Sequence, residues 1–190
     1  MSRILVGGLL GGIVVFLWGA FSHMVLPLGE AGFANLPDEP KVAEVLRAQV
    51  QKRAIYFLPG MPTDPHRTEA QKAADEAAWT DAYRRGPTGI LVIDPRGKEP
   101  FAPRAFAIEL ITDILGATIA ALLLTMAGLP SYLLRLLFVT MLGAFASVAI
   151  DLSYWNWYGF PDAYTVAAYF DQVLNWFFGG LVLAKIVRPG

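Results

Sequence analysis

The sequence lacks cysteine and has few charged residues. None of its 190 residues is cysteine, which excludes disulfides, thiolate metal sites, covalently attached c-type haem and cysteine nucleophiles. Charged residues make up only 16% of the chain, against about 25% in an ordinary soluble domain. The net charge of −1 argues against a nucleic-acid partner, which usually requires a basic face. Enzyme signatures such as G-x-S-x-G and H-E-x-x-H are also absent from the sequence.

The charges are distributed unevenly. Of the 31 charged residues, 22 lie between Leu26 and Arg104, so the other 111 residues carry only 9. Hydrophobic residues make up 55% of the chain and the mean hydropathy is +0.47. The pattern predicts an all-α integral membrane protein: four transmembrane helices, with a small α+β extramembrane insert between the first and the second.

Four apolar segments are long enough to span a bilayer, which takes about 20 residues. The first spans Ile4 to about Leu26 and is longer than the 7–15 apolar residues typical of a signal peptide, so we interpret it as an anchor. Leu129-Pro130-Ser131 and Tyr158-Gly159-Phe160-Pro161 predict the later turns. The predicted regions are a first helix in residues 1–26, an insert in 27–104, and a three-helix region in 105–190 with helices at about 105–127, 132–152 and 163–187.

Basic residues in the short flanking segments predict the orientation. Arg3, Arg135, Lys185 and Arg188 all fall on one side of a four-span chain, whereas the turn between the third and fourth spans has no Lys or Arg. The prediction is a multi-pass protein of the bacterial inner membrane with cytoplasmic termini. Residues 27–104 would then be periplasmic.

The insert is predicted to be ordered. Apolar periodicity and turn signals predict, in order, a helix at about 38–53, a strand at 55–58, a helix at about 65–85 and a strand at 89–93. Two strands form a marginal sheet by themselves. The insert is therefore expected to rest on the membrane region or on a partner, either as a compact cap or as a docking surface.

Two groups of residues are candidates for helix packing and interface contacts. The first helix carries two overlapping G-x-x-x-G pairs, which allow another helix, of this chain or a second chain, to approach closely. An aromatic stretch before the last helix is typical of a membrane-interface anchor, or could form a wall for a quinone, carotenoid or sterol-like ring. These candidates are Gly7, Gly8, Gly11, Gly12, Trp155, Trp157 and Tyr158.

Polar and ionisable residues within the predicted spans are the candidate binding site, because such groups are costly in a bilayer. The acidic residues among them are all predicted to lie in the outer half of the membrane. They would bind a divalent cation, relay protons, or hold a polar headgroup or a quinone. The alternatives are structural: these residues would form hydrogen bonds between helices, and Asp151 would cap the end of a helix. The candidates are His23, Glu109, Asp113, Asp151, Asp171 and Asn175.

Three stretches resemble a group of uncharacterised bacterial four-helix inner-membrane proteins. They are residues 16–27 (FLWGAFSHMVLP), 55–60 (IYFLPG) and 89–97 (GILVIDPRG). The resemblance implies one helix, an external insert and three further helices. It implies no activity, cofactor or catalytic residue.

Three functions remain open at this point. The first is a non-enzymatic accessory or scaffold subunit, whose partners are membrane lipids and other subunits of a larger membrane complex. The second is a binding or transport protein that uses the acidic cluster for a cation, a proton or a lipid-like ligand. The third is a membrane enzyme acting on lipid through an acid pair such as Glu109 and Asp113.

Overall fold

The computed structural model describes residues 1–188 and divides into two compact units. One unit comprises Met1–Phe33 and the chain from Glu99 onward, and the other comprises Ala34–Lys98. The first contains four helices long and apolar enough to cross a membrane, and the second contains the only sheet within the described residues. The predicted mostly helical fold with four membrane-length helices and a small sheet is therefore confirmed.

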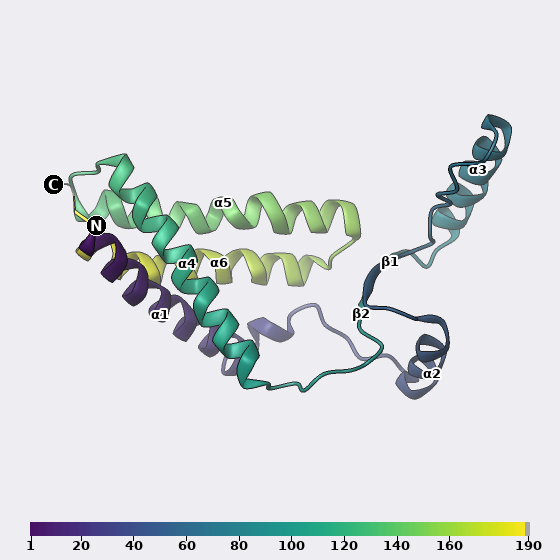
Figure 1. The fold of residues 1–190 in the computed structure, drawn as a ribbon, viewed down its shortest axis with the longest axis horizontal. Coiled ribbons are helices and arrows are strands. Elements are labelled where there is room, and N and C mark those ends of the chain that lie inside the picture. Colours follow the sequence, from purple (N-terminus) through teal and green to yellow (C-terminus); the bar gives the residue numbers. More distant parts are fainter. Residues whose placement is uncertain (189–190) are drawn as a thin grey trace. The chain divides into compact units, whose positions relative to one another are not determined.

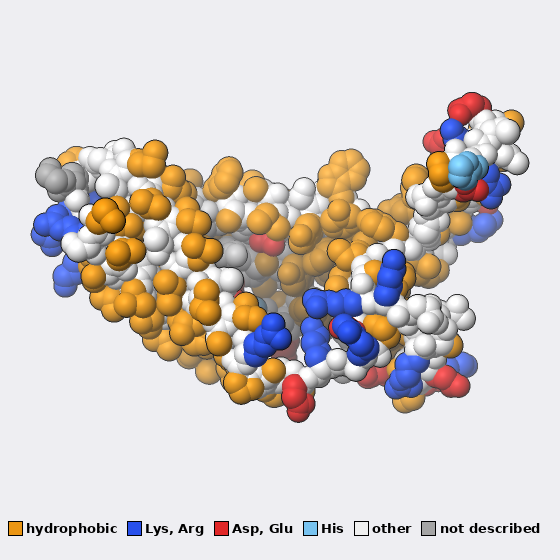
Figure 2. Space-filling view, viewed as in Figure 1, with side chains coloured by type: hydrophobic (Ala, Val, Ile, Leu, Met, Phe, Trp, Pro, Cys, Tyr) orange, Lys and Arg blue, Asp and Glu red, His pale blue; other side chains and the backbone are white. Residues whose placement is uncertain are grey.

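The four long helices are α1 (Ser2–Met24), α4 (Pro103–Ala127), α5 (Tyr132–Tyr158) and α6 (Asp162–Ile186). Even the shortest has 23 residues, or about 34 Å of helix, which exceeds the hydrocarbon thickness of a bilayer. Apolar side chains cover much of their outer surface, as Figure 2 shows. Such a surface is suited to lipid, and it supports a multi-pass membrane protein.

Two glycines end helices at the predicted turns. Gly128 and Gly159 follow α4 and α5 with φ of 60° and 69°, a left-handed conformation that glycine adopts without strain. The helix α5 continues to Tyr158, whereas the sequence predicted an end near Leu152. No residue between Leu152 and Gly159 breaks a helix, so the aromatic stretch forms the last turns of α5.

The helices of this unit pack in the order α4–α1–α6–α5. The helix α1 packs against both α4 and α6, and α6 packs most extensively against α5. The start of α1 and the end of α6 lie at the same end of the unit (Figure 1). The cluster of buried apolar residues, which includes Ala117, Ala121, Val139 and Leu183, also lies toward this end.

One glycine pair of α1 allows close approach of α4. A Cβ atom at Gly12 would lie 2.6 Å from the backbone nitrogen of Ile114 and even closer to its Cα atom. A Cβ at Gly8 would lie 2.9 Å from the Cα atom of Thr118. These are contacts with backbone, which cannot move aside as a flexible side chain can. Residues 8 and 12 therefore have to be glycine for α1 and α4 to pack this closely.

The other glycine pair of α1 lies against α6. A Cβ at Gly7 would lie 2.9 Å from Val187 Cγ2, and one at Gly11 would lie 3.0 Å from Leu183 Cγ. Both overlapping G-x-x-x-G pairs are thus used within the chain, on two different neighbours. They do not form an open face for a second chain.

Arg135 is a buried cation that binds backbone carbonyl groups. Its Nε donates to the oxygen of Ala184 (2.9 Å), and its Nη1 donates to those of Leu129 (3.0 Å) and Pro130 (2.8 Å). The side chain therefore joins the last turn of α6 to the turn after α4. A cation near the C-terminal ends of two helices also interacts favourably with their dipoles.

The second unit contains α2 (Glu39–Gln49), β1 (Ala54–Leu58), α3 (Glu69–Arg85) and β2 (Gly89–Ile93). The two strands pair antiparallel, with Ile55 opposite Val92. In the turn after β2, hydrogen bonds from Arg96 lower the pKa of the Asp94 carboxyl.

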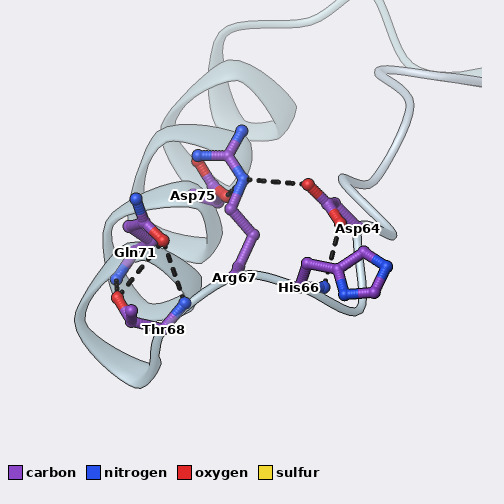
Figure 3. A network of polar contacts seen from close by, with 6 residues as sticks. All are labelled: Asp64, His66, Arg67, Thr68, Gln71 and Asp75. Atoms are coloured by element: carbon purple, nitrogen blue, oxygen red, sulfur yellow. Dashed lines mark hydrogen bonds and ion pairs between the residues drawn. The ribbon is translucent and has the colours of Figure 1, made fainter.

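The helix α3 begins four residues later than the sequence predicted. Thr68 and Gln71 form a capping box: the Thr68 hydroxyl accepts from Gln71 N, and the Gln71 side chain accepts from Thr68 N. Asp64, the residue before the predicted start, instead accepts from His66 N and pairs with Arg67, as Figure 3 shows. The T-x-x-Q pattern of residues 68–71 is thus the true start signal.

Candidate functional site

A cavity of about 590 Å³ lies in the half of the helical unit where α1 ends and α6 begins. Along α6 its lining runs from Tyr164 to Asn175, a depth of about 16 Å at the helical rise. Figure 2 shows a recess between α4 and α5 with acidic atoms visible inside it. Its size is that of a small-molecule site.

All six candidate binding residues line this one cavity, although they come from four helices. The helix α1 contributes one of them, α4 and α6 two each, and α5 one. They are His23, Glu109, Asp113, Asp151, Asp171 and Asn175.

Asp171 has both carboxylate oxygens occupied by groups of α1. The indole nitrogen of Trp18 donates to Oδ1 at 2.8 Å, and His23 Nε2 lies 3.1 Å from Oδ2. The side chain of Asp171 is 15% exposed and that of His23 is 59% exposed. Asp171 therefore joins α6 to α1, while its imidazole partner remains accessible from solvent.

The other three carboxylates have fewer partners. Asp151, two turns before the end of α5, accepts from the Ser147 hydroxyl at 2.5 Å and does not cap the helix end. Glu109 and Asp113 lie one turn apart on α4, and neither carboxylate has a hydrogen bond or ion pair with any described residue. Two acidic groups of the cavity wall are thus free to bind a ligand.

Two amide side chains lie deepest along α6. The carbonyl oxygens of Gln172 and Asn175 each have less than 1 Å² of accessible surface and no hydrogen-bond partner within residues 1–188. The sequence analysis named Asn175 but missed Gln172. Gln172 lies three residues before Asn175 in an apolar helix, so the two amides share a face. This spacing was the signal that could have identified Gln172 from the sequence.

Among the described residues, the cavity wall contains acidic and aromatic side chains but no Lys or Arg. Phe16, Phe33, Phe106 and Tyr164 supply aromatic rings. The sequence analysis named none of these four aromatic residues as a candidate for the binding site. Within residues 1–188, no group of three or more His, Asp or Glu side chains is arranged to hold a metal ion. The negative charges are spread over the wall of the cavity.

A segment outside the long helices closes one side of the cavity. The short 3₁₀ helix η1 (Pro27–Glu30) folds back so that Gly29 lies against His23. Gly32, at φ 79°, lies against Tyr164 of α6. The sequence analysis assigned residues 27–33 to the insert, but in the structure they pack with the helical unit and complete the site.

The interface candidates occupy the end of α5. Trp155 donates to Asp162 at 2.7 Å and is 46% exposed, and Trp157 is 72% exposed. Tyr154 and Tyr158 have ring centroids 5.6 Å apart. None of these residues lines the cavity, so the structure does not place them as a wall for a ring-shaped ligand.

Comparisons with protein-family models, curated proteins and solved structures found no match for this chain.

Proposed function

We propose that this protein binds a small organic cation in the cavity between its membrane helices. The observation that supports this most directly is the set of four carboxylates around one cavity whose lining contains no Lys or Arg. Carboxylates that share a site of low dielectric repel one another, and a bound cation relieves that repulsion. Glu109 and Asp113 are the residues expected to bind it, because neither has another partner among the described residues.

The shape of the site favours an organic cation over a bare metal ion. A cavity of about 590 Å³ accommodates a small organic molecule. The carboxylates come from three helices, and aromatic rings, which attract cations to their faces, lie among them. A neutral quinone or carotenoid has no positive charge for these groups to stabilise.

Replacing the two unpartnered acids should remove cation binding. The test is calorimetric titration of the full-length protein in mild detergent with n-butylammonium, 1,4-diaminobutane and n-butyltrimethylammonium. We expect at least one to bind, and a Glu109→Gln/Asp113→Asn double variant to bind it at least about tenfold more weakly. Asp162→Asn, an acid outside the cavity, is the matched control and should bind normally. The proposal fails if no cation binds, or if the anion butyrate binds as tightly.

We also propose that the cavity is on the outer side of a bacterial inner membrane, with both termini cytoplasmic. Arg3, Arg135, Lys185 and Arg188 support this orientation, because cytoplasmic flanks are enriched in basic residues. The cavity lies at the opposite end of the helices from these residues. The insert would then be periplasmic.

The orientation can be tested by labelling single cysteines, since the chain has none of its own. In intact spheroplasts, a membrane-impermeant maleimide should label Gln51→Cys in the insert and should not label Ser2→Cys. After permeabilisation both should be labelled. The reverse pattern before permeabilisation would overturn the proposed topology.

The accessory or scaffold function remains a prediction. The glycines of α1 do not support it, because they pack within the chain. The insert offers more support: Ile55 and Val92 are cross-strand neighbours, 62% and 71% exposed, on one face of the sheet. Native mass spectra after mild extraction would show copurifying subunits at fixed stoichiometry if the prediction holds, and this chain alone if it does not.

A further inference from the structure

The deep amides of the cavity constrain the chemistry of its ligand. The carbonyl oxygens of Gln172 and Asn175 are buried and lack a donor within the described residues. A buried acceptor without a donor destabilises the protein, so such groups usually have a partner in the complete assembly. Asn175 also lies one turn of α6, about 6 Å, deeper than Asp171.

Most of the polar wall accepts hydrogen bonds. The carboxylates of Glu109, Asp113 and Asp151 are acceptors when ionised, and the two amide oxygens need donors. A primary ammonium ion supplies both a positive charge and three N–H donors. A quaternary ammonium ion supplies the charge alone and leaves the amide oxygens unpaired.

We propose that the ligand of this cavity carries a primary ammonium group, toward which the side chains of Gln172 and Asn175 turn so that their unpaired oxygens accept its N–H groups, while its charge is balanced by the carboxylates. This inference rests on the proposed cation-binding function. The group could belong to a soluble alkylamine or to the ethanolamine headgroup of a membrane phospholipid. The cavity lining contains no Lys or Arg that would pair with a phosphate.

The test compares two cations that differ at the nitrogen alone. Full-length protein in mild detergent is titrated with n-butylammonium and with n-butyltrimethylammonium. We expect the primary amine to bind at least about tenfold more tightly, because its N–H groups fill acceptors that the methylated ion cannot. If neither ion binds, and 1,4-diaminobutane does not bind either, the proposed function itself fails. If both bind equally, or the quaternary ion binds more tightly, only this inference is overturned.

A double variant tests the two amides directly. Gln172→Met/Asn175→Leu keeps side chains of similar size and removes both unpaired oxygens, a change that is often neutral or stabilising in the absence of ligand. It should bring the two affinities close together while binding of the quaternary ion remains. A preference for the primary amine that persists unchanged would overturn the assignment to these amides. Asn175→Leu alone should give a smaller change in the same direction.

Changing the lipid around the protein distinguishes a soluble amine from an ethanolamine headgroup as the source of the ammonium group. In nanodiscs of ethanolamine phospholipid, a headgroup in the cavity would compete with n-butylammonium and weaken its apparent affinity relative to nanodiscs of choline phospholipid. Equal affinities in the two lipids would assign the site to a soluble amine. Both results are compatible with recognition of a primary ammonium group.

Discussion

Gly12→Ala should destabilise the helical unit by about 3 kcal/mol, although alanine is the better helix former. The added Cβ atom would lie 2.6 Å from the backbone nitrogen of Ile114, so α1 and α4 would have to separate. Separation would also disturb the contact of Gly8 with Thr118. Thermal unfolding in detergent, followed by circular dichroism, measures the change.

Gly19→Ala is the matched control for this prediction. It makes the same change on the same helix, but a Cβ at Gly19 has no heavy atom within 4 Å. The variant should unfold at the same temperature as the wild type or slightly above it, because alanine has the higher helix propensity. Equal destabilisation by the two substitutions would show that the close approach of α1 and α4 is not what requires glycine at position 12.

Arg135→Ala should destabilise the protein by about 3–5 kcal/mol. The substitution removes hydrogen bonds to Leu129, Pro130 and Ala184. It leaves the Ala184 carbonyl without this donor in a buried setting and the other two carbonyls without it in partly buried ones. Arg135→Lys should give an intermediate loss, since one ammonium group cannot reproduce the planar guanidinium geometry. Unfolding in detergent with increasing SDS measures both.

Arg188→Ala serves as the control for Arg135. Arg188 is exposed and makes one hydrogen bond with the described residues, from Nε to the oxygen of Lys185. Its removal should therefore change stability by no more than about 0.5 kcal/mol. If Arg135→Ala, Arg188→Ala and the wild type all unfold at the same SDS concentration, the hydrogen bonds from Arg135 to the backbone carbonyls do not stabilise the fold.

Much of the fold follows from local signals in the sequence. The four long helices could be predicted because apolar runs of this length and the turns at Gly128 and Gly159 are local features. The end of α5 was predicted too early because aromatic residues near a membrane boundary suggest an interface more strongly than a helix. The sequence predicts the start of α3 too early because Pro65 is typical of a first helical turn, whereas the capping box at Thr68 sets the actual start.

The site was predictable in composition and not in detail. The cost of polar groups in a bilayer identified the six candidate residues, and the structure brings all six to one cavity. The sequence could not show that Trp18 donates to Asp171, because the two residues are 153 positions apart. Nor could it show which glycine pair of α1 meets which helix, since both pairs have the same spacing.

The most direct test of the proposed function is to fill the cavity and measure cation binding. Gly19 lines the cavity, and a side chain there enters open space, so Gly19→Phe should occupy the site without disturbing helix packing. Leu17→Phe, on the 59% exposed neighbour two residues before it, is the control. In calorimetric titration with n-butylammonium, the wild type and Leu17→Phe should bind and Gly19→Phe should not, with all three unfolding at similar temperatures. Unchanged binding by a folded Gly19→Phe would contradict the assignment of the cavity as the ligand site.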